Sequence, residues 1–199
     1  KSLSRVRISS SPPQILCNSY GLQRIFVISA KLFRRIKGDL KMNNIIVRYA
    51  KRDELECVNK MRAEVNELHV NGRPDIFRPG FRTELQQRIY EVFDSDKADI
   101  IVAECGGTLC GFAMVEYIDR PESAYGNARS FYHIEEFGVD EAFRRMGVAS
   151  AIVEFCKGEA KAKGYNRIEL DVWEFNDGAI QFYKAAGFQT YRRLMQLDL

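Results

Sequence analysis

A short basic turn between a predicted strand and a predicted helix holds the residues best suited to chemistry. The apolar run Ser130 to Val139 leads into the turn VDEAFRRMGVAS, and helical periodicity follows it. The small residues Gly147 and Ala149 let backbone N–H groups approach a ligand closely, and a helix start favours an anion. Arg144 and Arg145 add positive charge. The turn therefore predicts a pyrophosphate site, with a solvated helix start carrying ordinary surface arginines as the alternative.

A second motif follows the first at a fixed distance. After another predicted strand, the segment WEFNDGAIQFYKAAGF has the spacing N-x-x-A-x-x-F-Y-x-x-x-G-F from Asn176 to Phe188. Preceded by R-x-x-G-x-A from Arg144 to Ala149, it resembles the two signature motifs of the GNAT superfamily, the acyl-CoA-dependent N-acyltransferases. The resemblance covers roughly Ile45 to the C-terminus and is specific from Ser130 onward.

The resemblance implies a fold in which helices flank both faces of a mixed, mostly antiparallel central sheet, an α/β fold of the α+β type. The periodicity of the chain fits the order β-α-α-β-β-β-α-β-α-β. Strands are predicted at 45–49, 98–104, 109–117, 130–139, 167–172 and 188–197, and helices at 53–68, 83–93, 148–163 and 178–186.

The resemblance also implies how acetyl-CoA is held as co-substrate. Backbone groups of the central strand would pair with the pantetheine arm and polarise the thioester, the basic turn would hold the pyrophosphate, and Asn176 would contact the pantetheine side. Gly138 would allow the strand to splay or would only relieve crowding in the sheet, and Asn176 could equally be a plain helix cap. The implied cofactor-binding residues are Phe137, Gly138, Val139, Arg144, Arg145, Met146, Gly147, Val148, Ala149, Ser150 and Asn176.

Acyl transfer to an amine needs a proton donor for the leaving thiolate. The resemblance implies that Tyr183 supplies this proton, because a tyrosine at the matching position of the family motif lies near the sulfur of the thioester. The alternative is that Phe182 and Tyr183 are both core aromatics at helical spacing. We predict the core role for Phe182 and the general-acid role for Tyr183.

A proton acceptor for the amine is expected on the central strand. Strict alternation places His133 and Glu135 on the same face as Phe137 and Val139, which makes Glu135 the first candidate base and His133 the second. Two alternatives stay open. Glu136 would replace them if a bulge reverses the alternation, and Asp171 matches a carboxylate that some family members carry on the next strand.

The loop HVNGRPDIFRPG separates the first two predicted helices and covers the acceptor site in this family. His69, Asp75 and Phe77 could therefore touch the substrate. A packed surface loop is an equal alternative.

Composition indicates one globular domain. The 199 residues are 46% hydrophobic and 29% charged, with no apolar run long enough to cross a bilayer. Five cysteines without a C-x-x-C pair and only two histidines predict neither a disulfide framework nor a metal site. A bacterial cytoplasm is the expected location.

The first 41 residues are predicted to be an extension separate from the domain at 42–199. They hold nine Lys or Arg against one acid, which leaves the remainder with a net charge of −5. The codons for Lys37 to Asp39 can contain a bacterial ribosome-binding site just before Met42. The extension is therefore expected to be a translated leader or a non-native segment.

The predicted function is N-acetyl transfer from acetyl-CoA to a primary amine of a small molecule or peptide, by direct transfer in a ternary complex. The alternatives are a protein N-terminal or lysine acetyltransferase and a non-catalytic acyl-CoA-binding sensor. Nucleic-acid binding through the basic extension ranks last, no membrane partner is expected, and a homodimer stays open because homodimers are common in the family.

Overall fold

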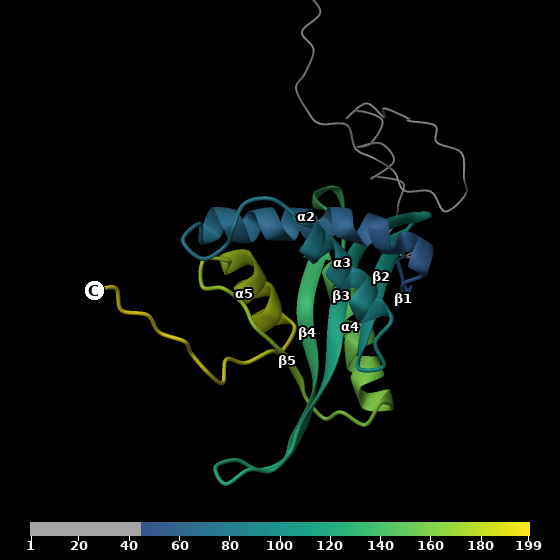
Figure 1. Cartoon of the computed structure of the whole chain (residues 1–199). Coiled ribbons are helices and arrows are strands. Elements are labelled where there is room, and N and C mark those ends of the chain that lie inside the picture. The colour runs from purple at the N-terminus through teal and green to yellow at the C-terminus, as the bar shows by residue number, and fades with distance from the viewer. Residues whose placement is uncertain (1–44) are drawn as a thin grey trace, which may run out of the picture.

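The computed structural model describes residues 45–199 as one five-stranded sheet with helices on both faces (Figure 1). The elements follow in the order β1 (Ile45–Tyr49), η2 (Arg52–Glu54), α2 (Leu55–Gly72), α3 (Thr83–Phe93), β2 (Ala98–Cys105), β3 (Thr108–Arg120), β4 (Arg129–Val139), η3 (Glu141–Phe143), α4 (Val148–Ala162), β5 (Ile168–Leu170) and α5 (Asp177–Ala185). The predicted mixed, mostly antiparallel sheet flanked by helices is confirmed. The predicted extension at 1–41 lies outside the described residues.

The strands lie in the same order in the sheet as in the chain, β1-β2-β3-β4-β5. The first four are antiparallel, and β5 runs parallel to β4. The β4–β5 ladder is short, pairing only Tyr132, His133 and Ile134 with Ile168, Glu169 and Leu170.

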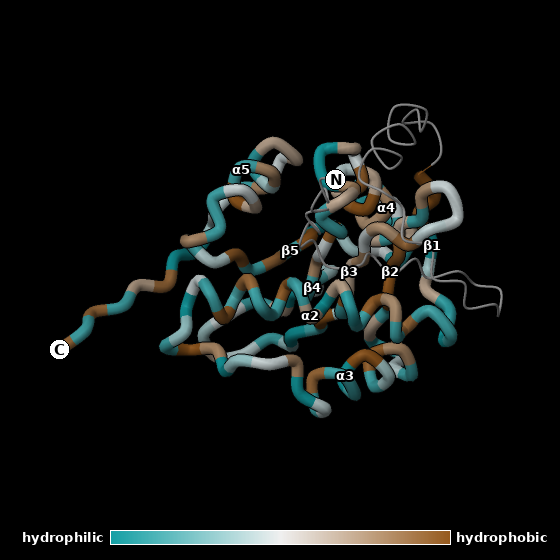
Figure 2. The backbone as a smooth tube through the Cα atoms, turned by 90° about the horizontal axis from the view of Figure 1, so that it is seen from above, coloured by the Kyte–Doolittle hydropathy of each residue, from teal (hydrophilic) through white to brown (hydrophobic). Residues whose placement is uncertain are grey.

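Two separate cores hold the layers together, and Figure 2 shows the sheet between them. On one face, α2 and α3 bury apolar residues such as Leu55, Val58 and Ile89 against β2 and β3. These residues recur at helical spacing, which is why the two segments fold as amphipathic helices. On the other face, α4 buries Val148 and Ile152 against the opposite side of the same strands.

The predicted last strand is wrong. Residues 188–197 contain no strand, and the segment 189–199 runs away from the body as an extended trace (Figure 1). It lacks a backbone partner, since no sheet pairing or backbone hydrogen bond joins it to the other described residues. The alternation in the sequence favours an extended conformation but does not supply the neighbouring strand that would make it part of a sheet.

Smaller differences concern element ends. The helix predicted to end at 68 continues to Gly72. It ends there because Arg73 precedes Pro74, and the residue before a proline disfavours the helical conformation. The strand predicted at 167–172 is only three residues long, and β3 is longer than predicted. No helix within residues 45–199 is long and apolar enough to cross a membrane.

Candidate active site

The turn from β4 into α4 opens the helix N-terminus to ligands. Gly147 is the N-cap of α4 with φ +88°, and a Cβ at this position would meet no atom within 4 Å. Arg145 also has a positive φ, 65°, the only non-glycine residue among 45–199 that does. No side chain among residues 45–199 caps the helix, so within this part of the chain its first backbone N–H groups are free to bind an anion. Arg144 and Arg145 are exposed beside them.

The edge of β4 that faces β5 is unpaired beyond Ile134. The last β4–β5 pair joins Ile134 to Leu170, so the described chain offers no strand partner to Glu135–Val139 on this side. An unpaired strand edge presents backbone N–H and C=O groups to whatever lies beside it. The segment predicted to bind the pantetheine arm is therefore accessible for backbone pairing.

Gly138 lies in this segment and faces the first two helices. A Cβ there would come within 2.5 Å of the Phe112 ring and 3.0 Å of Val65. Crowding against the α2 face of the sheet, the alternative explanation for this residue, is therefore sufficient to require a glycine here, and the predicted splay and cofactor contact of Gly138 stay predictions.

Tyr183 lies on α5, on the α4 side of the sheet. Its ring packs edge-on against Phe137 at 6.2 Å and Phe188 at 5.6 Å, between centroids. Burial raises the pKa of Tyr183 to about 12, and its hydroxyl has no hydrogen-bond partner among the described residues. The hydroxyl therefore stays protonated at neutral pH and is free to donate. Phe182 stacks on Phe137 at 6.1 Å but is only half-buried, since α5 holds no buried residue, so its predicted core role stays a prediction.

A shallow hollow lies between α4 and α5. It is lined by Ser150, Val153 and Glu154 from α4 and by Phe182, Ala185 and Ala186 from α5. Asn176, at the start of α5, accepts a hydrogen bond at 3.1 Å from the backbone N–H of Ala179 and so caps the helix. Its cofactor contact stays a prediction, as do those of Met146, Val148 and Ala149 in the open turn.

β4 contains a β-bulge where the candidate bases lie. Met114 of β3 lies opposite Glu136, while the next residue, Val115, lies opposite Ile134. Glu135 is therefore an extra residue without a partner on β3. A bulge of this kind breaks the alternation of side chains along a strand.

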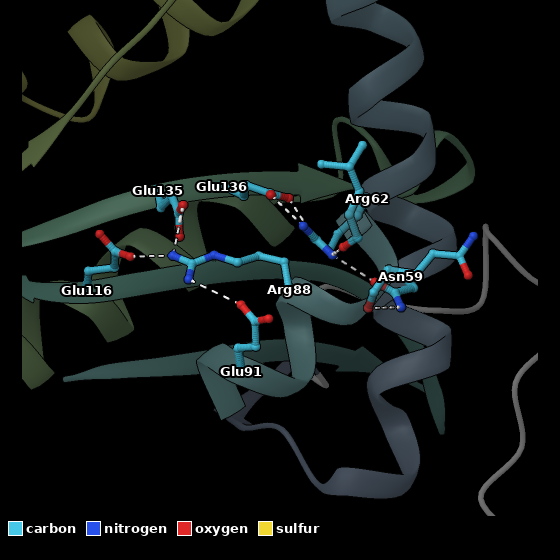
Figure 3. A network of polar contacts seen from close by, with 9 residues as sticks. Asn59, Arg62, Arg88, Glu91, Glu116, Glu135 and Glu136 are labelled. Atoms are coloured by element: carbon cyan, nitrogen blue, oxygen red, sulfur yellow. Dashed lines mark hydrogen bonds and ion pairs between the residues drawn. The ribbon is translucent and has the colours of Figure 1, made fainter. Parts of the chain in front are cut away.

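The bulge separates the carboxylates from the residues with which alternation had grouped them. Phe137 and Val139 pack in the core beneath α4, whereas Glu135 and Glu136 both contact arginines of the helices on the opposite face (Figure 3). His133 is also on that face, since it pairs with Glu116 of β3, which contacts α3. The predicted shared face of Glu135 with Phe137 and Val139 is wrong.

Glu136 is tied to a buried arginine of α2. Both its carboxylate oxygens accept hydrogen bonds from Arg62, at 2.7 and 2.8 Å, and the Arg62 side chain is only 1% exposed. Arg62 also donates to the Asn59 side chain and to the Leu85 carbonyl. Glu136 thus balances a buried charge, and a proton on it would leave that charge unpaired.

Glu135 is held more loosely. The Nη2 atom of Arg88, on α3, lies 3.4 Å from a carboxylate oxygen of Glu135. The same atom lies closer, at 2.8 Å, to a carboxylate oxygen of Glu116 (Figure 3). Burial, followed by the negative charge of Glu116, raises the pKa of Glu135, and Arg88 partly opposes this. A carboxylate with a raised pKa is a better proton acceptor, and the 3.4 Å contact of Glu135 with Arg88 is longer than the 2.7 Å contact of Glu136 with Arg62.

The other candidate bases are placed differently. The Nδ1 atom of His133 is buried without a hydrogen-bond partner among the described residues. Asp171 lies just beyond β5 and is exposed. No group of three or more His, Cys, Asp or Glu side chains in the described part of the chain could hold a metal ion.

Aromatic rings of α2 and the loop after it pack against rings of the segment after β5. His69 stacks on Phe77 at 5.2 Å, and Phe77 meets Trp173 edge-on at 5.3 Å. Phe175 packs against both His69 and Trp173. Burial lowers the pKa of His69. The predicted substrate loop is thus packed down over the end of β5, with Asp75 exposed and bonded to Arg73.

Sequence reasoning missed the two arginines and Glu116. Arg62 carried a usable signal, because it lies four residues after Val58 on the apolar face of α2, where a charged side chain needs a buried partner. Arg88 and Glu116 had no comparable signal, since they meet Glu135 only through the packing of α3 on the sheet.

A model of the acetyltransferase (GNAT) family matches residues 62–188, more than half of the chain. An uncharacterized N-acetyltransferase from Methanocaldococcus jannaschii is 33% identical over 96 residues. This stretch covers 47% of the present chain and 40% of the archaeal protein, so the chain matches less than half of that relative's length.

Solved structures share the architecture. A crystal structure of a mutant of the BH1408 protein from Bacillus halodurans has a TM-score of 0.74 at 29% identity, covering 77% of this chain and 99% of that one. The aminoglycoside N-acetyltransferase AAC(6')-Iy, solved in complex with CoA, has a TM-score of 0.63 at 18% identity and covers 78% and 95%. At that identity the likeness concerns the fold. The chain therefore belongs to the GNAT family of acetyltransferases, whose acetyl donor is acetyl-CoA.

Proposed function

We propose that the protein transfers the acetyl group of acetyl-CoA directly to a primary amine of a small molecule or peptide, within a ternary complex. The observation that carries the proposal is the unpaired edge of β4. It begins at Glu135, a candidate base, and leads toward the open N-terminus of α4, while Tyr183 lies over Phe137 on the other face. A strand edge between a proton acceptor and a proton donor suits a thioester attacked by an amine.

The donor side fits acetyl-CoA through backbone geometry. Free N–H groups at Gly147 and Val148 and the exposed Arg144 and Arg145 suit a pyrophosphate. The edge at 135–139 suits the amide groups of the pantetheine arm, which can pair with a strand as a peptide does. The hollow between α4 and α5 adds a concave surface beside Ser150.

The proton balance assigns one residue to each side. Glu135 takes a proton from the bound ammonium group, and the neutral nitrogen attacks the thioester carbon. A carbon–nitrogen bond forms, the carbon–sulfur bond breaks, and the thiolate of CoA takes the phenolic proton of Tyr183. The new amide nitrogen then gives up its surplus proton, which restores the Tyr183 phenol through water, and Glu135 releases the first proton to solvent. Glu135 is preferred over Glu136 because Arg62 occupies both oxygens of the latter.

The packed loop after α2 supports a small acceptor over a folded protein. His69, Phe77 and Trp173 hold this loop against the chain that follows β5. A protein lysine or N-terminal acetyltransferase needs an open groove for a polypeptide, and an aromatic cluster at this position narrows such a groove. AAC(6')-Iy, an aminoglycoside N-acetyltransferase with this fold, is an example of a small-molecule acceptor.

The proposal is tested by calorimetric titration with acetyl-CoA, followed by a screen of small amines and amino-terminal peptides that measures thiol release. Tyr183→Phe should lower turnover by one to two orders of magnitude while acetyl-CoA binding stays unchanged, since acid catalysis contributes about 10²-fold or more. Tyr165→Phe, at a tyrosine packed against Tyr117 away from the site, is the matched control. Binding without turnover for any amine would favour a sensor, and no binding would refute both.

A further inference from the structure

The β3–β4 hairpin continues past the rest of the sheet as a two-stranded ribbon, which projects below the sheet in Figure 1. Its outermost pairs, Ile118 with Phe131 and Arg120 with Arg129, join β3 only to β4. Phe131 precedes His133 by two residues and meets its ring edge-on at 6.2 Å, so both side chains lie on one face. This is the α2 and α3 face, on which the candidate bases lie.

Two arginines of the ribbon lie over the ring of Phe131. The guanidinium carbon of Arg120 lies 5.6 Å from the ring centroid, and that of Arg129 lies 5.0 Å from it. Phe131 is only 3% exposed. Contact with an aromatic ring orients a guanidinium group but leaves its N–H donors available for hydrogen bonds. The ring therefore holds two sets of donors close together.

Positive charge exceeds negative charge around these donors. Arg129 lies 3.3 Å from Glu169 of β5, and Arg167 lies 3.6 Å from the same carboxylate, so one acid serves two arginines. Arg120 has neither an ion pair nor a hydrogen bond to another side chain among residues 45–199. Like charges directly opposite each other on paired strands are destabilising, so an anion bound between Arg120 and Arg129 would relieve their repulsion.

We propose that Arg120 and Arg129 bind an oxyanion of the acceptor, an inference that rests on the proposed function because Glu135 receives the amine. The preferred acceptor is then an amine that also carries a carboxylate or a phosphate. Four residues of β4 separate Glu135 from Phe131, a distance of about 13 Å. An extended peptide of four residues also spans about 13 Å. A short peptide with an anionic end therefore fits this face.

The other charges on this face favour an anion over a second ammonium group. Glu116 lies 2.8 Å from Arg88, and Glu136 lies 2.7 Å from Arg62. A polyamine would have to compete with these arginines for the carboxylates. An oxyanion meets Arg120, which has no ionic partner in the described part of the chain, and gains charge-assisted hydrogen bonds without breaking an existing pair.

Steady-state acetylation of tetraalanine is compared with that of its C-terminal amide at saturating acetyl-CoA. We expect KM to be about tenfold lower for the free acid, because hydrogen bonds to a charged group contribute about that much. Arg120→Met should remove the difference, while Lys161→Met, on the exposed side of α4 across the sheet, should keep it. Trialanyl-phosphoserine amide separates the two anions, since a lower KM than that of tetraalanine assigns the site to phosphate and a higher one to carboxylate.

Binding is measured separately from turnover with N-acetyl-tetraalanine, which has no amine to acetylate. The side-chain Nε–H NMR signals of Arg120 and Arg129 should shift with this peptide and stay in place with its C-terminal amide. Such a shift without acetylation of any peptide would refute the proposed function and leave the anion site standing. Signals that stay in place or that shift equally with the amide, or a preference for the free acid that persists in Arg120→Met, would overturn the anion site.

Discussion

The two faces of β4 are built in different ways. On the α4 side, the candidate donor site is made of backbone: an uncapped helix start, a left-handed glycine at Gly147 and a strand edge without a partner. On the α2 and α3 side, the candidate acceptor site is made of charged side chains, with Arg62 bound to Glu136 and Arg88 shared between Glu116 and Glu135 (Figure 3).

The difference predicts how each side responds to mutation. A backbone site tolerates changes of side chain that leave its N–H groups accessible, and it fails when bulk or negative charge is added. A charged site depends on particular partners, so removal of one leaves the other unpaired and changes stability as well as proton affinity. The largest effect is therefore expected from a charge introduced on the donor side.

Gly147→Glu should weaken acetyl-CoA binding by about two orders of magnitude or more, since a carboxylate about 4 Å from a phosphate is repelled by several kcal/mol at an effective dielectric constant near 20. Gly164→Glu is the matched control. Gly164 lies beyond the other end of α4 with a similar φ of +84° and equally open space, so both variants carry the same backbone strain. Calorimetric titration compares them. Equal losses of affinity would show that strain, and not charge at the turn, is responsible.

Arg62→Met should destabilise the fold by about 3 kcal/mol, because it leaves the partly buried Glu136 without its counter-charge. Urea unfolding followed by circular dichroism measures the change. Arg52→Met is the control, since the Arg52 pair with Asp94 is exposed on both sides and its loss should leave the midpoint unchanged. A small effect at Arg62 would mean that water, and not the ion pair, satisfies Glu136.

Gly138→Ala tests a residue that belongs to the candidate pantetheine-binding edge of β4 and also faces the core beneath α2. A methyl group there would lie 2.5 Å from the Phe112 ring, so the core beneath α2 must shift, at a cost of about 1–3 kcal/mol. Gly158→Ala, in the open middle of α4, should instead stabilise the protein by about 0.5–1 kcal/mol. Thermal or urea unfolding of the two variants should therefore shift in opposite directions. A neutral Gly138→Ala would favour the splay explanation for this glycine.

The parts of the fold that could be predicted from the sequence are those with local signals. The apolar spacing of α2 and α3, the Gly106–Gly107 turn between β2 and β3, and the glycine at the start of α4 placed these elements within a few residues. The last strand could not be predicted in this way, because pairing depends on a neighbouring edge as well as on the strand's own pattern.

The candidate site also has one part with a local sequence signal and one part that depends on contacts between strands. The donor turn lies within one stretch of chain, so a motif describes it. The faces of Glu135 and Glu136 depend on the bulge opposite Met114 and Val115, which is a relation between two strands. Simple alternation therefore gave the wrong grouping. The alternative of a bulge was right about the break in alternation but not about Glu136, which lies with Glu135 on the α2 and α3 side.

The smallest predicted effect concerns the proton affinity of Glu135. Its pKa is raised by burial and by Glu116 and lowered by Arg88. If Glu135 is the base, kcat/KM should rise with pH through this pKa. Glu116→Gln should shift that acidic limb to lower pH, and Arg88→Gln should shift it to higher pH. Glu91→Gln, at an exposed partner of Arg88, should leave it in place.

Stability supplies an independent check on the same group. Because the folded pKa of Glu135 is raised, the folded state holds this proton more tightly than the unfolded state. Glu135 therefore lowers the free energy of unfolding as pH rises from the ordinary glutamate pKa through the raised one. Glu135→Gln should become more stable relative to the parent over that interval, measured by urea unfolding at a series of pH values. A constant difference across the interval, together with limbs that Glu116→Gln and Arg88→Gln do not separate, would exclude Glu135 as the base and leave His133 to be tested.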